Sequence, residues 1–326
     1  MHEIILIIVF LAIIFEISNG WNDSANAIAT VVSTRVLSPF QAVVLAACMN
    51  ILGAFFSTEV AKTIGEGVVS PEAINNTVVI AALLTAFLWN AILTRMGLPI
   101  SCSHALIGAL MGASVAYGGI AILNFAGLKK IFLSLMISPA IGVLLGYLMM
   151  KFLLKFFGAY SPGTLNRTFG RFQLISSAFM AFSHGSNDAQ KGMGIITLAL
   201  VSDGLLSSME VPFWVILTCA TAMGLGTAMG GWRVIKTLGV NMLKLEPIHG
   251  FAAETTAAAT IIVSSHYGLP VSTTHVIATS IMGVGATKRF SAVRWGLAGR
   301  IVMAWIFTLP ICFIAGWLIA ELLLHM

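Results

Sequence analysis

Long apolar stretches recur along the whole sequence, and they constrain the fold more than any other feature. The clearest of them cover residues 4–15, 77–94, 130–157, 211–229 and 295–324. Several approach the roughly 20 residues that a membrane-spanning helix needs. Only 9% of the residues are charged, whereas about a quarter are charged in a soluble protein. We therefore expect an all-α integral membrane protein with most of its surface in lipid and no separate soluble domain.

The polar residues exclude several functional classes. The formal net charge is +5, but the seventeen Lys and Arg residues are scattered singly between apolar segments. This distribution does not form a basic surface for nucleic acid, and we expect no nucleic-acid partner. The four cysteines lie within apolar segments without Cys-x-x-Cys spacing, which indicates neither a zinc site nor a disulfide framework.

The basic residues predict the orientation in the membrane. Two groups contain no acidic residue: Lys151, Lys155, Arg167 and Arg171 form the first, and Lys288, Arg289 and Arg294 form the second. The positive-inside rule places both groups in the cytoplasm. Each terminus carries a glutamate without a basic residue nearby, which predicts that both termini lie on the outer side. Each half then crosses the membrane an odd number of times, although Lys129 and Lys130 fit this orientation poorly.

Three motifs occur twice in the same order. They are Asn22-Asp23 with Asn187-Asp188, Lys62-Thr63 with Lys236-Thr237, and Gly97-Leu98-Pro99-Ile100-Ser101 with Gly268-Leu269-Pro270-Val271-Ser272, the last followed in each half by His104 or His275. Such a recurrence indicates duplication of a half-length unit. The prediction is a first repeat over 1–157, a cytoplasmic linker over 158–171 and a second repeat over 172–326. Because each half crosses an odd number of times, the two repeats should have inverted topology.

Transporters built from inverted repeats bind their substrate near the bilayer midplane, where helices are broken. A Gly-Leu-Pro turn followed by serine predicts such a break, because proline fixes the dihedral of a first helical turn and the hydroxyl caps free N–H groups. A helix N-terminus attracts anions through its free N–H groups and the positive end of its dipole. We therefore expect two anion-binding helix starts, after Pro99 and after Pro270.

Asp23 and Asp188 should lie at membrane depth, since each stands between apolar runs. A carboxylate there costs at least about 2.5 to 3.5 kcal/mol, which favours a functional role over a structural pairing with a helix N-terminus or a buried lysine. The surrounding oxygen atoms suit a hard cation such as Na⁺. An anion beside two aspartates would be repelled, so a cation between them is required. This argument predicts a cation-coupled anion transporter.

The predicted site residues fall into two overlapping sets. The predicted sodium ligands are Asn22, Asp23, Asn187, Asp188, Ser101, Ser272 and Glu254. The predicted substrate-binding residues are Asp23, Asn26, Ser101, Ser103, Asp188, Gln190, Ser272, Thr273 and Thr274. A structural ion pair is the alternative for Glu254, and Lys191 is open between a contact with the anion and an extension toward water.

The duplicated Asn-Asp motifs and the two Gly-Leu-Pro-x-Ser turns resemble those of the inorganic phosphate transporter (PiT) family, over nearly the whole chain. The resemblance implies two inverted repeats with re-entrant helical hairpins and about 10 to 12 membrane segments. It also implies a homodimer with both termini outside, as a multi-pass protein of the inner (plasma) membrane. The implied activity is symport of inorganic phosphate with a cation, and we expect Na⁺. The sequence departs from the family at Asn50, where relatives can carry glutamate, and at Lys191.

Other functions fit part of the pattern. A proton-coupled phosphate or metal–phosphate symporter and a sulfate permease would share the fold, and an anion channel would share the anion site. Two intramembrane aspartates that share a proton could also form the dyad of a membrane protease. A protease does not need duplicated Asn-Asp motifs or hydroxyl-rich helix starts, however, so we expect a transporter rather than an enzyme.

Overall fold

The computed structural model describes residues 2–325, and this part of the chain is helical without a strand. A single isolated bridge joins Val69 to Leu123. The helices are α1 (His2–Ser33), α2 (Pro39–Ala54), α3 (Glu59–Gly67), α4 (Asn76–Met96), α5 (Cys102–Gly118), α6 (Phe125–Phe157), α7 (Pro162–Ser202), α8 (Phe213–Met229), α9 (Trp232–Lys236), α10 (Pro247–His266), α11 (Thr273–Lys288) and α12 (Trp295–Leu324). The all-α prediction is therefore confirmed.

Four of the described helices, α1, α4, α6 and α12, are long and apolar enough to cross a membrane individually. Two further spans result if each bent helix pair counts as one, because α2 and α3 meet at 71° and α8 and the segment from α9 to Asn241 meet at 63°. α7 is the longest helix, with 41 residues, but it is the most polar of the long helices. Its polar segment carries the second Asn-Asp motif.

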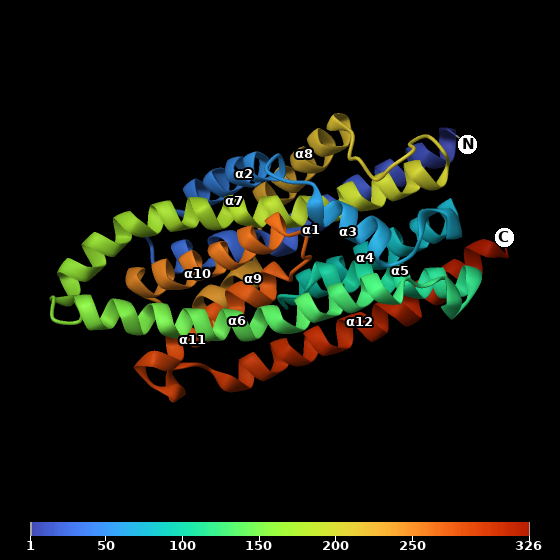
Figure 1. The fold of residues 1–326 in the computed structure, drawn as a ribbon. Coiled ribbons are helices and arrows are strands. Elements are labelled where there is room, and N and C mark those ends of the chain that lie inside the picture. The colour runs from blue at the N-terminus through green and yellow to red at the C-terminus, as the bar shows by residue number, and fades with distance from the viewer. Residues whose placement is uncertain (1, 326) are drawn as a thin grey trace.

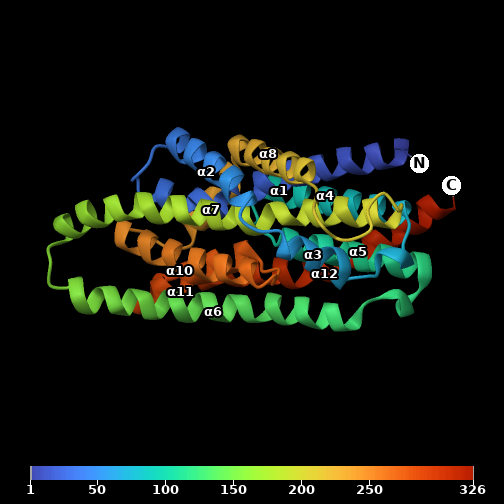
Figure 2. The same ribbon diagram turned by 45° about the horizontal axis from the view of Figure 1, so that its top comes forward.

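Equivalent helices of the two halves run in opposite directions. α1 and α7 are antiparallel, and so are α6 and α12 (Figure 1). Both chain termini lie at one end of the helix bundle, and the connection between α6 and α7 lies at the other end (Figures 1 and 2). This arrangement is what an inverted repeat requires.

The packing between the halves is reciprocal. α12 packs on α5 and α11 packs on α6, while α8 packs on α1 and α2 packs on α7. The two hairpins are α4 with α5 and α10 with α11, each joined by a Gly-Leu-Pro turn. Each hairpin also packs on a long helix of its own half, α4 on α1 and α10 on α7. Each of the two hydrophobic clusters contains residues of both halves, so elements of one half complete the core around elements of the other.

The backbone carbonyls of the two Gly-Leu-Pro turns find their partners in the same reciprocal way. The Thr237 hydroxyl donates to the Gly97 carbonyl at 2.8 Å, and the Thr63 hydroxyl donates to the Gly268 carbonyl at 2.7 Å. Both glycines have positive φ, 75° and 61°, a conformation that glycine adopts without strain. A non-helical backbone at membrane depth needs such partners, because lipid offers none. The repeated Lys-Thr motif is explained by this contact.

The backbone carbonyls of the two turn prolines also accept hydrogen bonds from side chains of the opposite half. The Trp305 indole N–H donates to the Pro99 carbonyl at 2.9 Å, and the Ser134 hydroxyl donates to the Pro270 carbonyl. Trp305 lies on α12 and Ser134 lies on α6, and these two helices are the antiparallel equivalents in the two halves. Helices of each half thus hold the turn of the other half.

Replacing Thr237 by valine is expected to destabilise the protein by about 1 to 3 kcal/mol, because the Gly97 carbonyl loses its donor inside the protein. Thermal unfolding of the purified protein in detergent measures the loss. Thr218→Val is the matched control, since the Thr218 hydroxyl is exposed and only returns to the carbonyl of Trp214 in its own helix. Equal melting temperatures for the two variants would contradict the role of Thr237.

The two acid-free basic groups lie at the same end of the bundle. The first group spans the end of α6 and the start of α7, and the second spans the end of α11 and the start of α12. Both places are at the end opposite the termini (Figure 1), as their common assignment to one side of the membrane requires. Lys129 and Lys130 lie near the start of α6, at the end that carries the termini. Which end faces the cytoplasm stays a prediction.

The connection between the halves is shorter than the predicted linker 158–171. α7 already begins at Pro162, and only residues 158–161 separate it from α6. The Ser161 side chain caps the new helix by accepting from the Thr164 N–H at 3.3 Å, and Pro162 follows as its first residue, a favourable N-terminal pair.

Candidate functional site

Two helices begin inside the protein at neighbouring points, as the sequence predicts. Ser101 and Ser272 are the N-caps of α5 and α11, and their hydroxyls accept from the N–H groups of His104 and His275, at 3.2 Å in each case. The tips of the two hairpins touch, because the Ser103 hydroxyl donates to the Val271 carbonyl at 3.3 Å. The N–H groups of the first turns have no partner within their own helices. The site therefore offers backbone donors from two helix N-termini.

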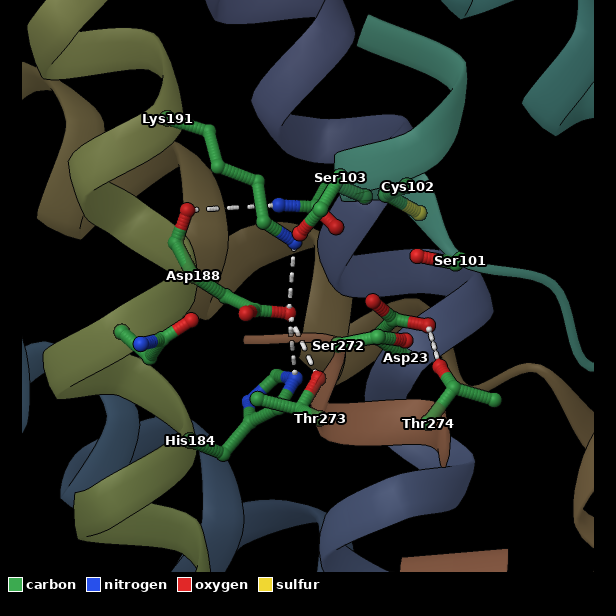
Figure 3. Close-up of polar contacts among 12 residues, drawn as sticks. Asp23, Ser101, Cys102, Ser103, His184, Asp188, Lys191, Ser272, Thr273 and Thr274 are labelled. Atoms are coloured by element: carbon green, nitrogen blue, oxygen red, sulfur yellow. Dashed lines mark hydrogen bonds and ion pairs between the residues drawn. The ribbon is translucent and has the colours of Figure 1, made fainter. Parts of the chain in front are cut away.

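Asp23 of α1 and Asp188 of α7 come together between these helix starts (Figure 3). One ligand atom from each of Asp23, His184 and Asp188 lies within 4.8 Å of the other two, and all three residues are buried. The start of α11 connects the carboxylates. Thr274 donates to Asp23 Oδ1 at 3.0 Å, and Thr273 donates to Asp188 Oδ2 at 3.0 Å. The predicted meeting of the two Asn-Asp motifs is thus present in the structure.

The two aspartates have different surroundings. Oδ2 of Asp188 lies 3.0 Å from Lys191 Nζ and 3.2 Å from His184 Nε2, in addition to its bond from Thr273. Oδ1 of Asp23 has the single partner Thr274. Asp188 is therefore neutralised within the protein, whereas Asp23 is a buried carboxylate without a cationic partner in direct contact among the described residues.

Asn50 belongs to the support of this site. Its Oδ1 lies 3.0 Å from His184 Nδ1, and its Nδ2 donates to Thr227 at 2.8 Å. Because Asn50 Nδ2 already donates to Thr227, the atom of Asn50 that faces the imidazole is the acceptor Oδ1, and Nδ1 of His184 is the donor. Nε2 of His184 is then the ring nitrogen directed at Asp188, and Asn50 orients it.

Five buried acceptor oxygens of the two Asn-Asp motifs and of Asn26 have no hydrogen-bond donor, and two of them belong to the aspartates themselves. Among the described residues these oxygens are Asn22 Oδ1, Asp23 Oδ2, Asn26 Oδ1, Asn187 Oδ1 and Asp188 Oδ1. A buried acceptor without a partner is rare and costly. Oxygen atoms of this kind are the ligands that hard cations prefer.

The orientation of the two motif asparagines is set by equivalent hydroxyls. Asn22 Nδ2 donates to Thr94 Oγ1 at 2.7 Å, and Asn187 Nδ2 donates to Ser265 Oγ at 3.0 Å. Thr94 and Ser265 both stand three residues before the glycine of a Gly-Leu-Pro turn. With its nitrogen fixed in this way, each amide has an oxygen that accepts no hydrogen bond.

Asn26 and Gln190 follow the aspartates by three and two residues, and the structure uses them differently. Asn26 Nδ2 donates to Thr273 and Thr274, at 3.3 and 2.9 Å, so Asn26 lies at the predicted site. Both ends of Gln190 are occupied by backbone: Oε1 accepts from the Ala61 N–H at 3.0 Å, and Nε2 donates to the Ser186 carbonyl at 2.5 Å. Gln190 thus attaches α3 to α7 in this structure.

Glu254 of α10 lies in a separate cluster. Its Oε1 accepts from Thr30 at 2.5 Å and from Gln173 at 3.1 Å, and its Oε2 accepts from Ser176. Thr30 follows Asp23 by seven residues on α1, which corresponds to about 10 Å along the helix axis. Glu254 is therefore not a direct neighbour of the paired aspartates, although it is fully buried.

Sequence reasoning missed two contributions to the site. His184 received no role, although it precedes Asp188 by four residues and so lies on the same helix face. Glu16 also received no role at the site, yet its carboxylate accepts from the Gly192 N–H at 2.6 Å and from Asn19 at 3.3 Å. The spacing signalled His184, but a contact between α1 and α7 such as that of Glu16 has no local signal.

Comparisons with known proteins identify the family of the chain. Residues 19–316 match the model of the phosphate transporter family. The chain is 46% identical to a Bacillus subtilis (strain 168) protein named "Probable low-affinity inorganic phosphate transporter", over 98% of this chain and 97% of that protein. It is 44% identical to a Rhizobium meliloti (strain 1021) protein of the same name, over 96% of each.

A solved structure described as "The sodium-dependent phosphate transporter" is also similar. It superposes with a TM-score of 0.92 at 25% sequence identity, over 99% of this chain and 100% of the solved chain. The family match covers far more than half of the chain, and two relatives exceed 40% identity over nearly their full length. The chain is a multi-pass membrane protein that belongs to the phosphate transporter family.

Proposed function

We propose that the chain imports inorganic phosphate together with sodium ions, by alternating access of a site between two inverted repeats. The observation that carries the proposal is the pair Asp23 and Asp188, flanked by unsatisfied acceptor oxygens and by the N-termini of α5 and α11. Acceptor oxygens hold a cation, and helix N-termini hold an anion. Because these two kinds of protein group lie side by side, binding of the cation favours binding of the anion: the cation screens the anion from the carboxylates.

The proposed roles follow the contacts. Sodium would be held by oxygens of Asn22, Asp23, Asn187, Asp188, Ser101 and Ser272. Phosphate would be held by the first-turn N–H groups and the hydroxyls of Ser103, Thr273 and Thr274, with the Asn26 amide alongside. Sodium is also named in the description of the similar solved structure.

Glu254 is proposed as a cation ligand outside the central site. Its carboxylate accepts three hydrogen bonds, which leaves coordination capacity for a cation. Because Glu254 is buried and lies on the linker side of the aspartates, it supports a second cation-binding site on the pathway of the ion. The homodimer and the location in the inner membrane with outer termini are also part of the proposal.

Labelled phosphate uptake into liposomes that contain the purified protein tests the proposal. We expect accumulation with an inward Na⁺ gradient, no accumulation with an inward H⁺ gradient alone, and no competition by sulfate. Accumulation with H⁺ alone would replace sodium by a proton as the coupling ion. Equilibration without accumulation would identify a channel, and the absence of phosphate transport would overturn the proposed function.

A further inference from the structure

Lys191 lies in the site without a role in the proposed function. It follows Asp188 by three residues on α7, and its side chain is only 2% exposed. The side chain bends back along α7, and its ammonium group lies beside Asp188, close to the start of α5 (Figure 3). The distance from Lys191 Nζ to Asp188 Oδ2 is 3.0 Å. A lysine is rarely this buried unless it is paired.

The duplication shows what stands in the same place in the first half. Asn26 follows Asp23 by three residues, as Lys191 follows Asp188. Asn26 is neutral, and its Oδ1 is one of the unsatisfied acceptors near Asp23. One half of the site therefore presents a carboxylate with a free acceptor oxygen beside it, and the other half presents a carboxylate with a fixed positive charge.

Buried carboxylates need compensating charge before an anion can bind beside them. We propose that the Lys191 ammonium is a tethered cation, which takes the place of one coupling cation beside Asp188. The protein then needs one free cation fewer per phosphate than the same site would need with asparagine at position 191. This inference rests on the proposed cation coupling and concerns its stoichiometry.

The surroundings of the two carboxylates favour this role over a contact with phosphate. The ammonium group contacts Oδ2 of Asp188, the oxygen that also has Thr273 and His184 as partners. Groups of the protein therefore already occupy this oxygen, and the ammonium supplies a positive charge there. Oxygens without a donor occur on both sides, namely Asp23 Oδ2, Asn22 Oδ1 and Asn26 Oδ1 on α1, and Asp188 Oδ1 and Asn187 Oδ1 on α7. Asp23 has no cationic partner in direct contact among the described residues, so the negative charge that a free cation must balance is on the α1 side.

Lys191→Asn, which introduces the residue of the equivalent first-half position, tests the proposal. The first readout needs no transport: the melting temperature of the purified protein is measured against the concentration of the coupling cation, without phosphate. Each cation that binds the folded state stabilises it in proportion to the logarithm of its concentration. We expect a slope steeper by one cation for Lys191→Asn and an unchanged slope for Lys191→Arg and for the exposed control Lys62→Asn.

Transport in liposomes gives the second readout. When the cation concentration is lowered tenfold, the half-saturating phosphate concentration of Lys191→Asn should rise about tenfold more than that of the wild type. The variant should also move one more positive charge per phosphate. If Lys191→Asn does not fold, Asn26→Lys tests the same count in the other half, and its slope should be lower by one cation.

Two results would overturn the inference while the proposed function stands. One is a wild-type cation slope in Lys191→Asn, or in Asn26→Lys where that variant is used. The other is an equal weakening of phosphate uptake at every cation concentration, which identifies Lys191 as a direct ligand of the anion. A wild-type protein whose phosphate transport shows no dependence on any cation would instead overturn the proposed function itself.

Discussion

Asp23→Asn is expected to abolish cation-driven phosphate uptake and to leave the fold intact. Asp23 has one hydrogen-bond partner, Thr274, and no cationic partner in direct contact among the described residues. An asparagine can keep the contact with Thr274 through its own oxygen, so little stability is lost. It cannot provide the negative charge that holds the cation. A lost charge-assisted contact of about 3 kcal/mol corresponds to a loss of cation affinity of about 100-fold or more.

The measurement is phosphate uptake into liposomes with an inward gradient of the coupling cation, together with the melting temperature of the same preparation. Asp203→Asn is the control for the chemical change. Asp203 lies at the end of α7, where its Oδ1 accepts from Asn76 at 2.7 Å, away from the site. We expect normal uptake in the control. Normal cation-driven uptake in Asp23→Asn would remove Asp23 from the cation site.

The helix starts could be predicted from the sequence because they are local features. Proline fixes one dihedral angle, and the serine two residues later reaches an N–H group only three residues further on. Both turns obey this rule, with Ser101 capping His104 and Ser272 capping His275. The approach of Asp23 to Asp188 was predictable for a different reason, since duplication makes equivalent residues neighbours where the halves meet.

Contacts between helices were not predictable to the same degree, because they depend on how each helix is rotated and where it crosses its neighbour. Gln190 is adjacent in sequence to the site residues, yet it faces α3 and binds the Ala61 N–H. Glu254 is as deeply buried as the aspartates, but α10 places it against Thr30 and Ser176. The apolar segment around Glu254 indicated that this residue lies inside the protein, but it could not give its neighbours.

The duplicated Lys-Thr motif shows most clearly what the sequence alone could not predict. Lys236 is exposed and Lys62 is partly exposed. The residues that the architecture needs are the threonines beside them, because Thr63 and Thr237 each satisfy a carbonyl in the opposite half. A repeated motif identifies a constrained segment, but only the packing shows which of its side chains makes the contact.

Asp188→Asn should differ from Asp23→Asn in one measurable respect, because it should strongly destabilise the protein as well as stop transport. The substitution leaves the Lys191 ammonium buried beside a neutral amide. Removing one partner of a buried ion pair typically costs about 3 to 5 kcal/mol, a large part of the stability of an ordinary protein. Glu59→Gln is the matched control, because Glu59 and Lys62 form an ion pair at 2.9 Å that is exposed. That loss should stay below about 1 kcal/mol.

The double variant Asp188→Asn, Lys191→Asn distinguishes instability caused by the unpaired Lys191 ammonium from instability caused by the other lost contacts of Asp188. It removes the carboxylate and the ammonium together, so no uncompensated charge remains from this pair. If the instability of Asp188→Asn comes from Lys191, the double variant regains most of the lost melting temperature, and the two substitutions are strongly non-additive. It should not regain transport, since the Asp188 carboxylate is still absent from the cation site. A double variant as unstable as Asp188→Asn would instead assign the loss to the contacts of Asp188 with His184 and Thr273.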